Sequence, residues 1–175
     1  MGISEMNMNN LLSFSAIVEE DIEPLTLIMT RAFDEDARIH LGEGKTDGPE
    51  GYNNGEFLRK WALNTSNGAY KILLDGELIG AYILWVNDNG NNYLGNIFID
   101  SSIQNKGIGR QVWGAIERKY PDTLKWIAET PGFSKRNHNF YINKCGFRLV
   151  EILNPGDIDK EMYVLHKEMS SFKSL

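Results

Sequence analysis

We start from one segment of the sequence, Tyr93-Leu-Gly-Asn-Ile-Phe-Ile99-Asp-Ser-Ser-Ile103-Gln104-Asn105-Lys106-Gly107-Ile108-Gly109-Arg110. Its apolar first half is typical of a buried strand, and it leads through a glycine-bearing turn into a helix. The first N–H groups of a helix have no intrahelical partner, and the helix dipole favours negative charge beside them. Gly107 and Gly109 leave these N–H groups uncovered, while Lys106 and Arg110 add positive charge. The segment therefore predicts a phosphate or pyrophosphate site.

Strand and helix patterns alternate on both sides of this segment. Asp75-Gly76 is a strong hairpin signal, so the strands beside it are expected to pair antiparallel. A strand-helix-strand unit around the helix after Gly107 predicts one parallel pair. The sequence thus predicts an α/β fold, a mixed sheet with helices packed on it. We expect strands at 14–18, 70–74, 78–86, 93–99, 124–128, 147–152 and 161–166, and helices at 22–37, 56–63, 107–120 and 134–144.

The composition excludes several classes of protein. The chain has 175 residues, 42% of them hydrophobic, which favours one globular domain over disorder. Its longest apolar run, Ala81 to Val86, is far short of the ~20 residues that span a bilayer. A single cysteine excludes an internal disulfide and a multi-thiolate zinc site. The first residues show no signal-peptide pattern. We therefore expect a cytoplasmic protein, with a flexible tail at 1–12 and one domain at 13–175.

Charge is distributed unevenly along the chain. The net charge is −6, which argues against a nucleic-acid binder. The first 100 residues hold 16 acidic and 6 basic residues, and the remainder holds 8 and 12. The acidic half would suit a cationic substrate and the basic half a small polyanion, although surface charge also varies along a chain without function.

Two motifs together resemble a known family. Gln104-x-x-Gly107-x-Gly109 after a hydrophobic strand resembles the acyl-CoA signature of the GNAT superfamily, the GCN5-related N-acetyltransferases. Phe140-Tyr141-Ile-Asn-Lys144-Cys145-Gly146-Phe147 resembles that family's Tyr-x-x-x-Gly-Phe block. The resemblance covers roughly Phe14 to His166. It implies the GNAT-type mixed, mostly antiparallel sheet of six to seven strands with about four helices.

The resemblance also implies a site for acetyl-CoA as co-substrate. In the family, amides of the signature turn hold the pyrophosphate, and the preceding strand pairs its backbone with the pantetheine arm where the fourth and fifth strands splay apart. A backbone N–H near Ile99 would stabilise the oxyanion of the reaction. Carried over, the expected cofactor-binding residues are Ile97, Phe98, Ile99, Gln104, Asn105, Lys106, Gly107, Ile108, Gly109, Arg110, Asn137 and Lys144. Ser134 stands where many members have Asn.

Catalytic roles follow less directly from the resemblance. Tyr141 matches the family's usual general acid, and the alternative is an aromatic residue that only packs beside Phe140 and Phe147. Histone-type members carry a glutamate on the fourth strand, but Tyr93 to Ile99 contains no acid. We expect Glu129, at the end of the fifth strand, to be the base. Asp34 and Asp36, expected after the first helix, come next, and each of the three could equally be a surface carboxylate.

The function that the resemblance implies is N-acetyl transfer. The chain would move the acetyl group of acetyl-CoA directly to a primary amine, on a small molecule or a peptide N-terminus. The alternative is a non-catalytic CoA-binding sensor or interaction module. We expect no metal, because His40, His138 and His166 show no metal-binding spacing, and no nucleic-acid or membrane partner. Cys145 is expected to be a small buried residue, and a homodimer is left open.

Overall fold

The computed structural model describes residues 11–63, 68–104 and 106–169. The predicted tail lies outside them apart from Leu11 and Leu12, and Leu12 already begins the first strand. The strands are β1 (Leu12–Ala16), β2 (Gly68–Leu74), β3 (Glu77–Trp85), β4 (Asn91–Ile99), β5 (Lys125–Pro131), β6 (Arg148–Leu153) and β7 (Met162–Glu168). The helices are α1 (Ile22–Leu41), α2 (Glu56–Trp61), α3 (Ile108–Lys119) and α4 (Lys135–His138), which continues as the π-helical η3 (Asn139–Lys144). Short 3-10 turns, η1 (Glu19–Asp21) and η2 (Ser101–Ile103), complete the order.

The seven strands form one mixed sheet, as predicted. Their order is β1-β2-β3-β4-β5-β7-β6, and only the β4–β5 pair is parallel. At the predicted β2–β3 hairpin, Asp75 and Gly76 have φ values of 52° and 84°, the positive pair that a tight primed turn requires.

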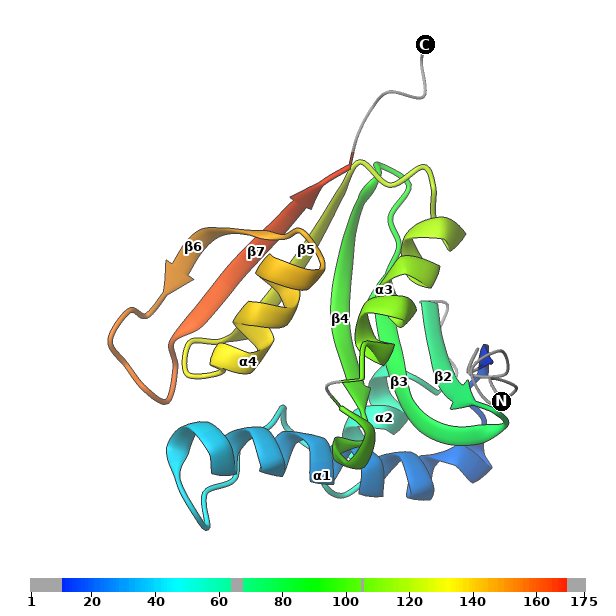
Figure 1. The fold of residues 1–175 in the computed structure, drawn as a ribbon, viewed down its shortest axis with the longest axis horizontal. Coiled ribbons are helices and arrows are strands. Elements are labelled where there is room, and N and C mark those ends of the chain that lie inside the picture. Colours follow the sequence, from blue (N-terminus) through cyan, green and yellow to red (C-terminus); the bar gives the residue numbers. More distant parts are fainter. Residues whose placement is uncertain (1–10, 64–67, 105, 170–175) are drawn as a thin grey trace, which may run out of the picture.

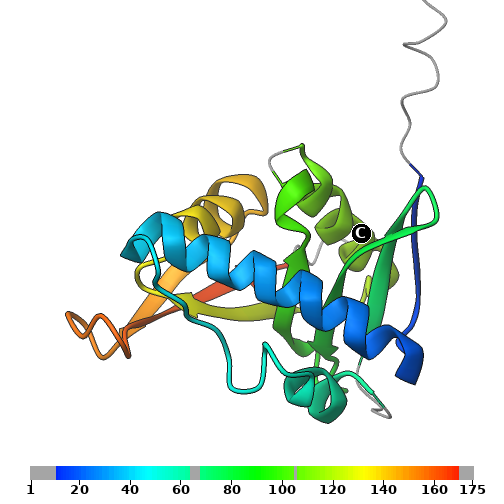
Figure 2. The same cartoon turned by 90° about the horizontal axis from the view of Figure 1, so that it is seen from below.

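The sheet opens between β4 and β5, as the resemblance implied. Their ladder runs only from Asn91↔Lys125 to Leu94↔Ala128, and beyond Leu94 β4 pairs with β3 alone. The β3–β4 register shifts at this point, and the indole of Trp85 lies where a Cβ on Gly95 would stand. Figure 1 shows the two strands diverging toward α1, which crosses the open end, and Figure 2 shows α1 from below. A strand edge is thus left unpaired beside α1.

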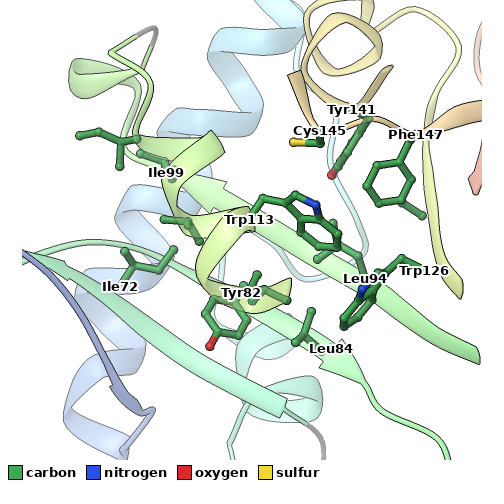
Figure 3. Close-up of a cluster of buried hydrophobic side chains, with 14 of the residues drawn as sticks. Ile72, Tyr82, Leu84, Leu94, Ile99, Trp113, Trp126, Tyr141, Cys145 and Phe147 are labelled. Carbon is green, nitrogen blue, oxygen red and sulfur yellow. The ribbon is translucent and has the colours of Figure 1, made fainter. Parts of the chain in front are cut away.

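Each face of the sheet has its own hydrophobic core. Under α3 and α4 the core includes Trp113, Trp126 and Phe147 (Figure 3). Under α1 and α2 it includes Leu25 and Phe98. Because both faces are covered, the central strand β3 is buried from Ile79 to Leu84. The sheet is therefore a fixed frame for its open edge.

Two predicted helices differ from those observed. The first helix, predicted to end at residue 37, continues to Leu41 and ends at Gly42, where φ is 115°. Asp34 and Asp36 lie inside α1, within the range already predicted for this helix, and not after it. The predicted helix 134–144 is one α-turn followed by a π-helix, in which the N–H of Cys145 bonds to the carbonyl of Phe140 at 3.0 Å. The later end of the first helix coincides with Gly42, a residue type that often follows a helix, whereas no local signal in 134–144 marks the π turn. In the part of the chain described, no helix is long and apolar enough to cross a membrane.

Candidate functional site

A cavity of about 180 Å³ lies at the open end of β4 and β5. Most of the expected cofactor-binding residues line it, together with the expected general acid. These are Ile97, Phe98, Ile99, Gln104, Gly107, Ile108, Gly109, Arg110, Asn137, Tyr141 and Lys144. The remaining lining residues are Ala32, Phe33, Asp36, Ile103, Arg136, Asn139 and Phe140. Of these, Ile103, Arg136 and Phe140 were not assigned to a site from the sequence, and Asp36 was among the candidate bases. Lys106 is exposed and outside this lining, and Asn105 lies outside the described residues.

The start of α3 presents uncovered N–H groups to this cavity. Gly107 is the N-cap residue with φ of 78°, and no atom lies within 4 Å of where its Cβ would be. A Cβ on Gly109 would stand 3.2 Å from the ring of Phe140. The two glycines therefore have different requirements. Gly107 supplies a left-handed backbone, and Gly109 lets α3 approach η3 closely.

Gln104 connects the turn to two other elements. Its Nε2 donates to the carbonyl of Ile99 at 2.9 Å, and its Oε1 accepts a hydrogen bond from the guanidinium of Arg136. The backbone N–H of Arg136 approaches Nε2 of His40 at 3.4 Å. Arg136 is thus held in the cavity by the first residue of the signature. The basic pair Lys135-Arg136 at the head of the fourth helix was the signal in the sequence that could have found it.

Tyr141 both packs in the core and lines the cavity. Its ring lies 5.2 Å from that of Phe140. It also lies 5.5 Å from the ring of Phe147, and Figure 3 shows these two rings. Burial raises the pKa of its phenol well above the ordinary value, with the nearby Cys145 adding to the effect. The hydroxyl is therefore protonated at neutral pH, as a proton donor must be.

The spacing of the tyrosine block differs from the pattern quoted above. Four residues separate Tyr141 from Gly146, one more than in Tyr-x-x-x-Gly-Phe. The wider π turn of η3 accommodates the extra residue, since each of its hydrogen bonds encloses one residue more than an α-helical bond. As a result Tyr141 lines the cavity, whereas Ile142, which has the quoted spacing to Gly146, does not.

The three carboxylates expected as bases lie in different places. Asp36 lines the cavity, and its Oδ2 accepts a hydrogen bond of 2.7 Å from Oγ of Ser134. Asp34 accepts a hydrogen bond of 2.6 Å from the hydroxyl of Tyr52. Glu129 is exposed on β5 and does not line the cavity. The structure thus brings only Asp36 together with Tyr141, and the catalytic role of Glu129 stays a prediction.

The loop between α1 and α2 is attached to α1 through Tyr52. Tyr52 is buried and packs against Phe33 with ring centroids 5.8 Å apart. Burial and the hydrogen bond to Asp34 raise its pKa to about 12. Burial also raises the pKa of Asp47, followed by the negative charges of Asp159 and Asp36. Acidic groups of the loop, of the β6–β7 connection and of α1 therefore share one electrostatic environment.

Two further observations concern thiol chemistry and metal binding. Cys145 is buried, and this burial raises the pKa of its thiol to about 12, which disfavours a nucleophilic thiolate. Within residues 11–63, 68–104 and 106–169, His, Cys, Asp and Glu form no group of three or more that could hold a metal ion.

Comparison with known proteins places this geometry in context. The model of the acetyltransferase (GNAT) family matches residues 29–147. An uncharacterized protein of Bacillus subtilis (strain 168), YrkN, is 42% identical over 95 residues, which are 54% of this chain and 51% of that protein. The match thus spans about half the length of that curated relative.

Solved structures share the fold at low sequence identity. An acetyltransferase from Thermus thermophilus has a TM-score of 0.72 at 16% identity, over 90% of this chain and 97% of its own. A Bacillus subtilis acetyltransferase in complex with CoA has a TM-score of 0.63 at 19% identity, over 93% and 100%. The PaiA N-acetyltransferase of Thermoplasma acidophilum, in complex with coenzyme A, has a TM-score of 0.66 at 16% identity, over 91% and 99%. At such identities the likeness shows the fold alone.

Proposed function

The chain belongs to the GNAT acetyltransferase family, and we propose that it is an acetyl-CoA-dependent N-acetyltransferase that moves the acetyl group directly to a primary amine. One observation carries the proposal. The cavity between β4 and β5 combines an unpaired strand edge, the N-terminal N–H groups of α3 and the protonated Tyr141.

The residues around the cavity fit a CoA molecule. Arg110, Arg136 and Lys144 line it beside the first turn of α3, so cations and N–H groups face one region that suits a pyrophosphate. The backbone of Ile97 to Ile99 is free on the β5 side to pair with an amide-bearing arm. The similar proteins of Bacillus subtilis and Thermoplasma acidophilum were solved with CoA bound. Acetyl-CoA supplies an activated acetyl thioester.

This chain's own residues supply the remaining chemistry. The free N–H groups at the end of β4 are oriented by the sheet, and such fixed donors stabilise charge on a carbonyl oxygen. Tyr141 holds a proton close to the same cavity and can give it to the departing thiolate. The single domain at 13–175 and the cytoplasmic location stay predictions, and a homodimer is left open.

The proposal is tested by binding and by turnover. Calorimetry should show that acetyl-CoA binds the wild-type protein and that Gly109→Val weakens binding at least about tenfold, because a side chain there displaces Phe140. Gly114→Ala, on the same helix but outside the cavity, is the matched control and should bind normally. A panel of primary amines with acetyl-CoA should then release CoA thiol.

Each result has a defined meaning. Binding followed by thiol release with at least one amine supports the enzyme. Binding of acetyl-CoA without thiol release for any amine favours the alternative, a CoA-binding sensor or interaction module. The lack of an acidic residue in β4 is the observation that agrees with this alternative. A folded wild-type protein that binds no acetyl-CoA contradicts both.

A further inference from the structure

The cavity is strongly asymmetric in charge. Among the described residues that line it, Arg110, Arg136 and Lys144 are basic, and Asp36 is the only acid. The cations lie on α3, α4 and η3, whereas Asp36 lies on α1, which crosses the open end of the sheet (Figures 1 and 2). Building on the proposed function, we infer that Asp36 binds the ammonium group of the acceptor and takes its proton.

One oxygen of the Asp36 carboxylate accepts a hydrogen bond from the protein, and the other accepts none from the residues described. Its side chain is 15% exposed, and Oδ2 accepts the 2.7 Å hydrogen bond from Ser134, which is itself completely buried. Oδ1 is buried and has no hydrogen-bond donor among the residues described. A buried carboxylate oxygen without a donor is unfavourable, so a donor that carries positive charge would be bound strongly there. An acceptor ammonium is such a donor.

His40 explains why Oδ1 lacks a donor from the protein. Nε2 of His40 lies 3.4 Å from Oδ1 of Asp36, and it also lies 3.4 Å from the backbone nitrogen of Arg136. If Nε2 accepts from that N–H, it carries no hydrogen of its own to give to Asp36. After a small side-chain movement, Nε2 of His40 can accept a proton from Asp36. His40 therefore leaves Oδ1 without a hydrogen-bond donor and provides a route for the proton afterwards.

The surroundings of Asp36 favour a cation. Asp47, from the loop after α1, and Asp159, from the β6–β7 connection, lie in the same electrostatic environment, as the raised pKa of Asp47 indicates. The guanidinium of Arg136 donates to the amide of Gln104. Asp36 thus lies near other acidic side chains, whereas Arg110, Arg136 and Lys144 line other parts of the cavity.

The other two candidate bases are less suited to this role. Asp34 is bonded by the hydroxyl of Tyr52, and Glu129 is exposed on β5; neither lines the cavity. Asp36 is therefore the carboxylate that can compensate for the acid missing from β4.

The proton balance of the transfer is complete with these groups. Asp36 takes one proton from the ammonium, which frees the nitrogen lone pair to form a C–N bond to the acetyl carbon as the C–S bond breaks. Tyr141 protonates the sulfur, and the new amide nitrogen loses a second proton that restores Tyr141. The proton on Asp36 leaves to solvent through His40. An amine of pKa near 10 is free base only about one part in a thousand at pH 7, so the first step matters most near neutrality.

The test uses Asp36→Asn, which has nearly the same shape as wild type. With the best amine of the panel, kcat/KM at pH 7 should fall by about 100- to 10,000-fold. The dissociation constant for acetyl-CoA should change by less than about twofold, because the phosphate-binding side is untouched. Part of the lost rate should return as pH rises and free amine becomes plentiful. Asp36→Glu keeps a carboxylate and should retain more activity than Asp36→Asn.

Two further variants complete the design. Glu23→Gln removes an exposed carboxylate from the same helix and should behave as wild type. Ser134→Ala removes the hydrogen bond that positions Asp36 and should raise KM for the amine more than it lowers kcat. Thermal unfolding monitored by circular dichroism establishes that each variant folds.

The inference and the proposed function fail in different ways. If wild type transfers acetyl groups and a folded Asp36→Asn keeps full kcat/KM, Asp36 is not the acceptor site. A loss that is equal at every pH contradicts proton transfer to Asp36. If Glu129→Gln shows a pH-dependent loss of kcat/KM and Asp36→Asn does not, the base is Glu129. If wild type transfers to no amine at all, the proposed function itself is wrong.

Discussion

Nε2 of Gln104 donates a hydrogen bond of 2.9 Å to the backbone carbonyl of Ile99. This contact ties the first residue of the signature turn to the last residue of β4. Because Arg136 donates to the other end of the same amide, one side chain joins β4, the turn and α4. Gln104 therefore positions the N–H groups of α3 relative to the open strand edge through its side chain as well as its backbone.

Gln104→Met should weaken both stability and cofactor binding. Methionine has a similar length but cannot replace either hydrogen bond. We expect the free energy of unfolding to fall by about 1 kcal/mol, and the dissociation constant for acetyl-CoA to rise about three- to tenfold. Urea unfolding and calorimetry measure the two effects. Gln111→Met, on the exposed face of α3, is the control. Wild-type values for Gln104→Met would mean that the contact contributes nothing.

Tyr141→Phe should separate packing from catalysis. The ring contacts with Phe140 and Phe147 survive the substitution, so the melting temperature should stay close to wild type. Loss of a general acid should lower kcat by about 100- to 10,000-fold. Steady-state kinetics on the best acceptor provides the measurement, with Tyr70→Phe on β2 as the control for loss of a hydroxyl elsewhere. Near wild-type turnover would assign Tyr141 to packing alone.

The ion pair between Arg31 and Asp100 should make stability depend on pH. It joins α1 to the end of β4 at 2.8 Å. Burial raises the pKa of Asp100, but hydrogen bonds from Arg31 and Ser102 outweigh burial and leave this pKa lowered. The contribution is therefore complete above the unfolded value, about 3.9, and is lost as pH falls through the lower folded value.

Asp100→Asn tests this dependence. Because Arg31 is half exposed, we expect a loss of only about 1 kcal/mol at pH 7. The difference from wild type should shrink as the pH of urea unfolding is lowered below about 4. A difference that stays constant with pH would show that the charge of Asp100 is not involved.

Cys145 should resist alkylation in the folded protein. Its thiol is buried, and its pKa is raised to about 12, so little thiolate exists and reagent cannot reach it. Iodoacetamide at pH 8 should label the native chain far more slowly than the urea-unfolded chain, as followed by mass spectrometry. Cys145→Ala should retain acetyl transfer. Rapid labelling of the native state would contradict the observed packing.

Local sequence determined the order of elements and the strand-turn-helix segment at the proposed phosphate site. The apolar run before Gln104 and the two glycines after it are read within one segment of chain, and the structure has a strand, a turn and a helix there. The Asp75-Gly76 turn depends only on its own backbone preferences. Such features need no distant partner, so residue type and spacing suffice to predict them.

Tertiary structure alone decided the surroundings of Asp36. Asp36 and Ser134 are 98 residues apart, and their contact exists because α1 passes the head of α4. The π turn of η3, which keeps Tyr141 at the cavity despite one extra residue before Gly146, likewise depends on packing of that segment. Helix length and π winding differ from the alternatives by little local free energy, so the contacts between elements decide them. The sequence by itself therefore predicted the strand, turn and helix that line one part of the cavity, and only packing determined which carboxylate lines it with them.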